Sequence, residues 1–307
     1  MLKHNKIIIG TEQLGGTDWG KYNVSNTESA IKYALDFGLR SFDTANVYGL
    51  GLSEKRLSNL LGNLRHECEI ITKVGFCWNK NIKSHRLDVK KNLSYKSMLS
   101  GVEESLKNLK IDRIPVLLAH WPDNIHTTEE VIENLYLLKE KGLINKIGLS
   151  NFNLDKIITI QHLTPIDFYQ GPLSLLDFSN LDSYRNISRQ GVNMLTYGPL
   201  HHGMLTGKYN LKSKFPKTDR RHRLIDFIGD HGEKNYTKVD IISKYAEILE
   251  CDVKALAINM LFTFELDARI ILGVKNIEQL NENLNSLDLN IPKNIARSLI
   301  TELSQIN

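Results

Sequence analysis

Eight short apolar runs recur along the chain, and amphipathic segments separate most of them. Such an alternation of strand-like and helix-like patterns is typical of parallel βα units. Eight units in 307 residues fit a (β/α)8 barrel, the TIM-barrel form of the α/β class. A doubly wound open sheet is the alternative, although it normally needs fewer strands. The runs span residues 7–10, 39–44, 69–76, 114–120, 146–151, 166–170, 192–198 and 269–274.

Two of the intervening segments show the helical pattern clearly. In residues 96–109, apolar side chains at Met98, Val102 and Leu106 recur every four residues and form one helical face. Residues 27–37 show a similar face, and Asn26 is the expected N-cap. No linker rich in Pro, Gly or Ser divides the chain, so residues 1–307 are expected to form a single domain.

Composition and charge argue against several classes of protein. The formal charge is +4 and no dense basic block with interleaved aromatics occurs, so nucleic-acid binding is not expected. Cys68, Cys77 and Cys251 are scattered and form no CxxC pair, which argues against a disulfide framework or a zinc site. The first apolar run is too short for a signal peptide, and none approaches the roughly 18 residues of a membrane span. A cytoplasmic protein is expected.

Four titratable residues stand near the ends of predicted strands. Asp43 lies at the end of the second strand and Tyr48 in the loop after it. Lys73 lies in the third strand, and His120 follows the fourth. Each has an ordinary explanation by itself, such as a helix cap, an edge lysine, a packed ring or a turn. In a (β/α)8 barrel, active sites lie where strands end and the following loops begin. Together, the four residues predict a site in the mouth of the barrel.

At these residues the chain resembles the aldo-keto reductase superfamily. The resemblance rests on DTANVYG (43–49), ITKVGF (71–76), LLAHWPD (117–123) and IGLSNF (147–152). It continues in FYQ (168–170), YGPLHHGMLTGKY (197–209) and ILGVKNIEQLNEN (271–283). The matches run in order from about residue 7 to about residue 285. The resemblance implies a (β/α)8 barrel that reduces carbonyls with a nicotinamide cofactor.

The resemblance implies that Asp43, Tyr48, Lys73 and His120 are the catalytic residues. Tyr48 is expected to donate a proton to the alkoxide that forms when hydride reaches a carbonyl. A free phenol has a pKa of about 10, and the Lys73 ammonium is expected to lower that value. Asp43 is expected to keep Lys73 charged, and His120 to orient the carbonyl oxygen.

The resemblance also implies a cofactor site. Ser150, Asn151 and Gln170 match the residues that bind the nicotinamide carboxamide. Tyr197 matches the ring that stacks on the nicotinamide, and residues 198–205 match the pyrophosphate segment, whose backbone N–H groups suit anions. The expected cofactor contacts are Gly10, Thr11, Asp43, Ser150, Asn151, Gln170, Tyr197, Gly198, Pro199, Leu200, Gly203, Leu205, Gly273, Val274, Lys275, Gln279, Glu282 and Asn283.

The chain departs from the family's pattern in several places. Lys275 stands where arginine is common, and lysine offers a point charge in place of a bidentate fork. NADP is still the expected cofactor, with NAD as the alternative. Gly198 replaces a common serine. Only about six residues precede the first strand, so the family's N-terminal hairpin is expected to be absent or very short. The expected substrate-pocket residues are Glu12, which replaces an apolar or aromatic residue, Trp19, Phe76, Trp78 and Trp121.

Two other clusters carry weaker signals. The spacing of His201, His202, His222 and His231 matches no set of metal ligands, so solvated loop histidines and no metal are expected. The basic stretch 212–223 could attract a phosphorylated substrate, but a solvated loop that holds only the cofactor is slightly favoured.

Three functions are compatible with the sequence. The first is an NAD(P)H-dependent reductase of an aldehyde or ketone, including a sugar-derived one. The second is an NAD(P)-dependent sugar or alcohol dehydrogenase. The third is a cofactor-binding regulatory subunit of the potassium-channel β-subunit type, which the complete set of four catalytic residues disfavours. The expected partner is a small carbonyl substrate, without nucleic acid or membrane, and the expected state is a monomer or weak oligomer.

Overall fold

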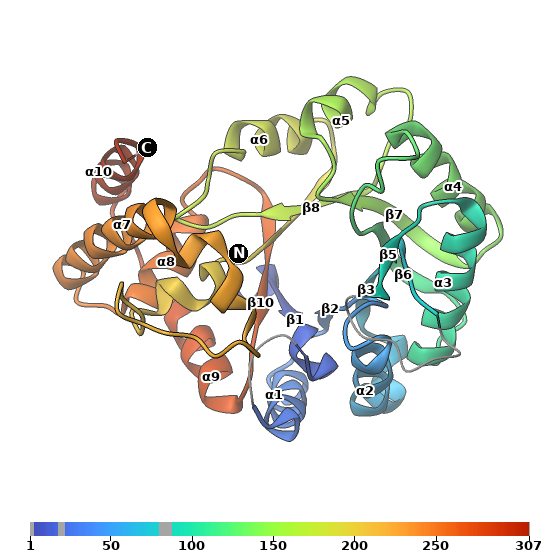
Figure 1. Cartoon of the computed structure of the whole chain (residues 1–307), viewed down its shortest axis with the longest axis horizontal. Coiled ribbons are helices and arrows are strands. Elements are labelled where there is room, and N and C mark those ends of the chain that lie inside the picture. The colour runs from blue at the N-terminus through green and yellow to red at the C-terminus, as the bar shows by residue number, and fades with distance from the viewer. Residues whose placement is uncertain (1–2, 18–21, 80–87, 307) are drawn as a thin grey trace.

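Eight parallel strands close into a barrel, and helices surround it (Figure 1). The computed structural model describes residues 3–17, 22–79 and 88–306. The strands follow one another around the ring in the order β1, β10, β9, β8, β7, β6, β3 and β2. Their bounds are β1 Ile7–Gly10, β2 Ser41–Asp43, β3 Glu69–Val74, β6 Ile114–Ala119, β7 Ile144–Ser150, β8 Phe168–Pro172, β9 Asn193–Tyr197 and β10 Ala268–Gly273. The predicted (β/α)8 barrel is confirmed.

Each predicted apolar run overlaps one barrel strand, and the third run shows an informative difference. The run predicted over 69–76 divides at Gly75, whose φ of 112° is a backbone conformation that glycine adopts without strain. The chain turns there out of the barrel into β4 (Phe76–Cys77), which pairs antiparallel with β5 (Lys90–Lys91). This small hairpin stands beside the barrel mouth and brings Phe76 to it.

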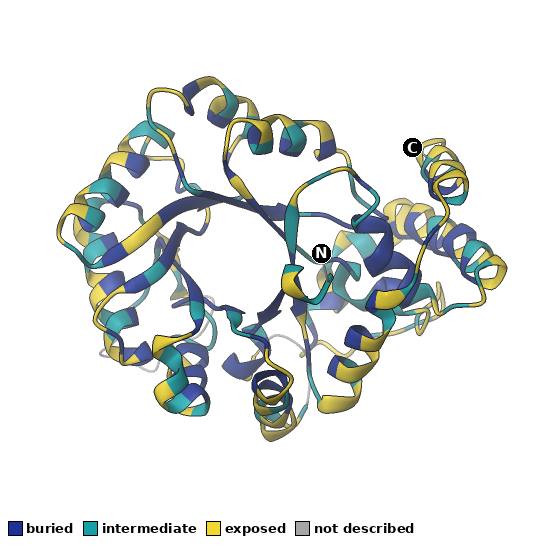
Figure 2. Ribbon diagram, turned by 180° about the vertical axis from the view of Figure 1, so that it is seen from behind, coloured by how far each residue is buried: buried dark blue, intermediate teal, exposed yellow. Residues whose placement is uncertain are grey.

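The core has two layers, which explains why the strands read as continuous apolar runs. Figure 2 shows the strands buried along the ring, while the helices bury their inner faces and expose their outer ones. Strands covered on both faces need apolar residues at every position. The inner layer fills the barrel with Ile8, Ile71, Val116, Leu118, Phe168, Leu195 and Ile271. The outer layer packs the other strand residues against the helices.

The helices confirm the two predicted segments and shift their boundaries. The expected helix over 96–109 is α3, which begins one residue earlier. The helix expected over 27–37 begins at Val24, and its cap is Asn23 and not Asn26. Asn26 already lies in the first turn, because its N–H donates to the Asn23 carbonyl at 3.1 Å. The helices are α1 Val24–Asp36, α2 Leu52–Leu61, α3 Tyr95–Leu109, α4 Thr128–Glu140, α5 Leu154–Ile160, α6 Leu181–Arg189, α7 Gly229–Ile248, α8 Val253–Leu261, α9 Ile277–Asn285 and α10 Lys293–Ser304. Among the described helices, none is long and apolar enough to cross a membrane.

Two cations contact one aromatic ring near the amino ends of the strands. The chain enters β1 through a short 3-10 turn, η1 (Lys3–Lys6), and no hairpin precedes β1 within residues 3–6. At the amino ends of the strands, Lys146 Nζ and Arg269 Cζ lie 5.5 and 5.7 Å from the centre of the Phe168 ring. Arg269 also forms an ion pair with Glu69. A cation over an aromatic face is attracted to the ring, and the apolar stem of its side chain can cover neighbouring apolar surface.

Candidate active site

A cavity of about 550 Å³ opens at the carboxyl ends of the strands. Its lining includes residues that end or directly follow six of the strands: Gly10, Asp43, His120, Asn151, Tyr197 and Gly273. Segments from the loop after β9 form another part of its wall, including η5 (His201–Thr206) and η6 (Arg220–Arg223). The cavity therefore lies where (β/α)8 barrels place their active sites.

A buried ion pair and a phenol stand side by side in this cavity's floor. Lys73 Nζ donates to Asp43 Oδ1 at 2.6 Å and to the Thr44 carbonyl at 2.8 Å. It lies 3.5 Å from the Tyr48 hydroxyl. The side chains of Lys73 and Asp43 are 1% and 5% exposed, so the pair is almost fully removed from water. The strand ends thus bring three of the four predicted catalytic residues into one hydrogen-bonded chain.

The pKa of Tyr48 moves in the opposite direction from the one expected. Burial raises the pKa of the Tyr48 phenol well above its ordinary value, the carboxylates of Asp43 and Glu12 raise it further, and Arg220 opposes them. The pKa is therefore raised overall, so the expected net lowering is wrong. The physical reason is that the Lys73 ammonium is balanced by Asp43, which it contacts more closely than it contacts the phenol.

His120 faces the same part of the cavity as Tyr48. The centres of their rings are 5.9 Å apart in an edge-to-face arrangement, and the Phe76 ring packs against His120 in the same way at 5.2 Å. The backbone fixes the position of His120, because its N–H donates to the Val74 carbonyl at 2.9 Å. Its own carbonyl accepts from Asn151 Nδ2 at 3.1 Å. The fourth predicted catalytic residue therefore joins the other three.

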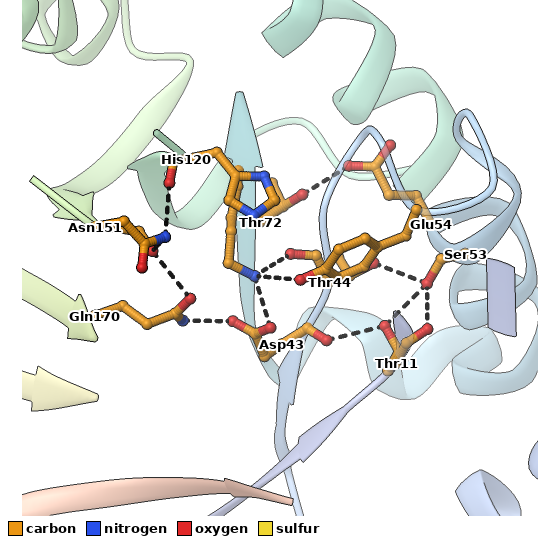
Figure 3. Close-up of polar contacts among 12 residues, drawn as sticks. Thr11, Asp43, Thr44, Ser53, Glu54, Thr72, His120, Asn151 and Gln170 are labelled. Carbon is orange, nitrogen blue, oxygen red and sulfur yellow. Dashed lines mark hydrogen bonds and ion pairs between the residues drawn. The ribbon is translucent and has the colours of Figure 1, made fainter. Parts of the chain in front are cut away.

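The residues expected at the nicotinamide form a second chain that ends on Asp43 (Figure 3). Gln170 Nε2 donates to Asp43 Oδ2 at 2.8 Å, and Ser150 Oγ donates to Gln170 Oε1 at 3.4 Å. Asn151 Nδ2 donates to Ser150 Oγ at 2.9 Å. The Tyr197 hydroxyl donates to Asn151 Oδ1 at 2.7 Å. The polar wall of β7, β8 and β9 is thereby tied to the Asp43–Lys73 pair across the barrel.

Most of the expected cofactor residues line one continuous cavity. Those on its surface are Gly10, Thr11, Asp43, Asn151, Gln170, Tyr197, Gly198, Pro199, Leu200, Gly203, Gly273, Lys275, Gln279, Glu282 and Asn283. Ser150, Leu205 and Val274 are fully buried and do not line it, so they support the wall from behind. At Gly273, an added Cβ would lie 3.0 Å from the Gln13 amide, so a larger residue would crowd the wall.

Several cations gather at the end of the cavity formed by α9 and η6. Lys275 is joined there by Arg221, Lys208 and Lys254, none of which the sequence analysis had singled out as cofactor contacts. Arg221 is engaged by a bidentate contact with Asp219, at 2.9 and 2.6 Å, and Lys254 by an ion pair with Glu282 at 2.5 Å. Burial and the nearby Arg221 lower the pKa of Lys275, and Asp219 opposes them. The basic stretch 212–223 therefore contributes Arg220 and Arg221 to the cavity wall, while most of its other residues are exposed.

Three of the five expected substrate-pocket residues line the cavity: Glu12, Phe76 and Trp121. Glu12 does not face the cavity as an isolated acid, because Arg220 Nη1 donates to its Oε1 at 3.1 Å. Trp121 lies at the rim, 39% exposed, with the Lys91 ammonium 5.3 Å from the centre of its ring. Trp78 does not line the cavity, and Trp19 lies outside the described residues.

His201 and His202 are more buried than expected, whereas His222 and His231 are exposed, as solvated histidines would be. His201 and His202 line the cavity, and burial lowers the pKa of His202 to about 4, so that it is neutral at physiological pH. His201 Nε2 and His231 Nε2 each lie 3.4 Å from Asp226 Oδ1. Within residues 3–17, 22–79 and 88–306, no group of three His, Cys, Asp or Glu side chains is arranged to hold a metal ion. The histidine pair is thus a structural part of the cavity wall.

The chain belongs to the aldo/keto reductase family. The model of the Aldo/keto reductase family matches residues 6–299, and this is a family of oxidoreductases that reduce carbonyls with NAD(P)H.

Similar proteins include both enzymes and a channel subunit. The NADH-specific methylglyoxal reductase of Escherichia coli (strain K12) is 27% identical, over 94% of this chain and 91% of its own. A putative voltage-gated potassium channel subunit beta of Schizosaccharomyces pombe is 27% identical, over 87% of this chain and 80% of its own. Among solved structures, the glycerol dehydrogenase AKR11B4 from Gluconobacter oxydans has a TM-score of 0.84 and 27% identity, and the match covers 98% of this chain and 92% of that one.

The raised pKa of Tyr48 predicts a phenol that stays protonated across the physiological range. The phenolate absorbance of the wild type and of Tyr48→Phe would be titrated with pH, and the difference between the two curves assigned to Tyr48. We expect this difference to show no phenolate below about pH 10, the ordinary pKa of tyrosine. A single tyrosine that ionises near neutral pH and is lost in the variant would show instead that Lys73 dominates its environment.

Proposed function

We propose that this protein is an NADPH-dependent reductase that converts a small aldehyde or ketone into an alcohol, with Tyr48 as the proton donor. The observation that carries the proposal is the contact chain from Gln170 through Asp43 and Lys73 to Tyr48, which ends at the cavity floor. Such a chain connects the wall proposed for the nicotinamide directly to the proposed acid.

The residues present fit a nicotinamide dinucleotide. The wall of the cavity combines amide side chains at Asn151 and Gln170 with glycines at Gly198 and Gly203, where the backbone has φ of 71° and 92°. Left-handed turns of this kind form concave backbone segments whose N–H groups suit a pyrophosphate, and the Gly203 N–H here donates to the Leu200 carbonyl at 2.8 Å and holds the turn. Lys275 and Arg221 supply positive charge further along. When bound, the cofactor supplies the hydride.

The chain's own residues handle the proton. A Tyr48 phenol with a raised pKa is protonated at neutral pH, and it can still protonate an alkoxide, which is a much stronger base than phenolate. Lys73 lies near enough to the phenol oxygen to stabilise the negative charge left on it. His120 lines the cavity beside Tyr48, where a ring N–H can orient the carbonyl oxygen.

The Glu12–Arg220 pair supports a hydroxylated, sugar-derived substrate. Both side chains are about a quarter exposed, and both line the cavity. A hydroxyl group can donate to a carboxylate and accept from a guanidinium, whereas a purely apolar tail can do neither. Phe76 and Trp121 supply the apolar part of the same pocket. A small carbonyl compound with neighbouring hydroxyl groups therefore matches this pocket.

Two alternatives have support from particular relatives. The similarity to a glycerol dehydrogenase favours the reverse reaction, the oxidation of an alcohol with NAD(P). The similarity to a potassium channel β-subunit favours a regulatory role. The complete contact chain among Asp43, Lys73 and Tyr48 supports catalysis over regulation alone. Turnover of a generic aldehyde with NADPH separates an enzyme from a purely regulatory subunit.

The substitution Tyr48→Phe tests the proposed acid. It removes the hydroxyl and keeps the ring, and loss of a general acid is expected to reduce kcat on the order of 10²–10⁴-fold. Cofactor binding, measured by quenching of tryptophan fluorescence, should survive. Tyr136→Phe is a matched control, because its hydroxyl donates to the Pro165 carbonyl far from the cavity. Near-normal turnover by Tyr48→Phe would refute the assignment.

Cofactor preference is expected to depend on Lys275. An ammonium–phosphate contact at a half-buried site is worth roughly 1–3 kcal/mol, so Lys275→Ala should weaken NADPH binding by about ten- to a hundredfold and affect NADH much less. Lys275→Arg should hold or improve the preference through its bidentate fork. The measurement is the dissociation constant of each cofactor for the wild type and the variants.

Lys254→Ala is the control for this experiment, because Lys254 lines the same cavity but pairs with Glu282. We expect it to change binding of the two cofactors by similar factors. Equal losses of NADPH and NADH affinity in Lys275→Ala would show that Lys275 supports the loop and does not read the 2′-phosphate. A wild type that prefers NADH would overturn the choice of NADP.

A further inference from the structure

The first turn of α2 buries two polar side chains behind Tyr48. Ser53 and Glu54 are each 0% exposed, although serine and glutamate in a first helical turn usually cap the helix or face water. The N-cap residue here is Gly51, and no side chain caps this helix. Both side chains instead enter the polar contacts between α2 and the strands (Figure 3).

Ser53 connects Tyr48 to the segment that holds Lys73. Its hydroxyl donates to the Thr11 carbonyl at 2.8 Å and lies 3.0 Å from the hydroxyl groups of both Thr11 and Thr44. Its backbone N–H donates to the Tyr48 carbonyl at 3.2 Å. The Thr44 carbonyl in turn accepts from Lys73 Nζ. Ser53 therefore contacts both the backbone of Tyr48 and Thr44, whose carbonyl orients the Lys73 ammonium.

Glu54 ties the same helical turn to the strand of Lys73. Its carboxyl group accepts from Thr72 Oγ1 at 2.7 Å and from Asn108 Nδ2 at 3.0 Å. Thr72 directly precedes Lys73 in β3, and Asn108 lies in α3. Burial raises the pKa of Glu54, and these hydrogen bonds oppose that shift. A buried carboxyl group is costly unless such bonds satisfy it, so the turn and the strand are firmly joined.

The loop between Tyr48 and α2 depends on outside contacts for its shape. Gly49, Leu50 and Gly51 have φ of 59°, 54° and 91°, and the left-handed region is unfavourable for the leucine. An added Cβ at Gly49 would lie only 2.3 Å from the Gly15 carbonyl oxygen, so the loop is pressed against the segment after β1. Unfavourable backbone conformations of this kind persist only where the surrounding structure holds them in place.

We propose that Ser53 and Glu54 are positioning residues that hold the Tyr48 hydroxyl beside Lys73 for proton transfer. The proposal rests on the proposed function, because it requires Tyr48 to be the proton donor. Misplacement of a reacting group by about 1 Å can cost on the order of 10²-fold in rate. A residue that acts through the Tyr48 hydroxyl has no further effect once that hydroxyl is gone.

A double-mutant cycle tests this directly. Wild type, Ser53→Ala, Tyr48→Phe and the double variant are assayed for reduction of glyceraldehyde by NADPH. We expect Ser53→Ala to lower kcat by about tenfold or more, with much smaller changes in KM and in the cofactor's dissociation constant. On the Tyr48→Phe background, the same change should cause no further loss. Glu54→Gln keeps the side-chain volume and should show the same pattern of kcat losses. It replaces Ser53→Ala in the cycle if Ser53→Ala does not fold.

Ser58→Ala is the matched control. Ser58 is buried in the same helix, and its hydroxyl donates to the Leu109 carbonyl at 2.7 Å, away from the cavity. It should lower Tm while kcat stays within about twofold of the wild type. If Ser53→Ala or Glu54→Gln lowers kcat by the same factor in the wild type and in Tyr48→Phe, the positioning role is overturned. A wild type that reduces no aldehyde with NADPH or NADH would overturn the proposed function, and this inference with it.

Discussion

The ion pair between Asp43 and Lys73 is the interaction on which the rest of the site depends. Removing two charges from water costs several kcal/mol for each ion, so a buried pair persists only where other hydrogen bonds satisfy it. Asp43 receives Lys73 on one oxygen and Gln170 on the other, and Lys73 also donates to the Thr44 carbonyl. The third contact of the Lys73 ammonium is with the Tyr48 hydroxyl. Satisfying the pair therefore also places the phenol.

Barrel geometry makes this pair possible. Asp43 lies opposite Ile71 in the register of β2 and β3, and Ile71 points into the barrel's inner core. Side chains two residues apart on a strand share a face, so Lys73 also points inward, one layer above Ile71. Closure of the sheet brings Gln170 of β8 within 2.8 Å of Asp43. The apolar layer below and the polar layer above are thus consecutive levels of the same strands.

The sequence predicted the barrel well because strands buried on both faces leave continuous apolar runs, and the strand-end residues followed from that geometry. Features that depend on distant neighbours could not be predicted. The raised pKa of Tyr48 follows from burial, and the partner of Glu12 lies in the loop after β9. Glu54, near a helix start, resembles an ordinary first-turn acid, and only the strands behind it give it another setting. The cap at Asn23 was missed because Asn26 offered the same chemistry nearby.

The free energy of unfolding of three variants tests the central claim about the buried pair most directly. Urea titrations of Lys73→Met, Asp43→Asn and the double variant would be compared with the wild type. Lys73→Met is expected to lose about 3–5 kcal/mol, because it leaves the Asp43 carboxylate buried without its cation. The double variant should be more stable than Lys73→Met alone, because no charge is then left unpaired. Losses that simply add, or a loss below about 1 kcal/mol in Lys73→Met, would contradict the account.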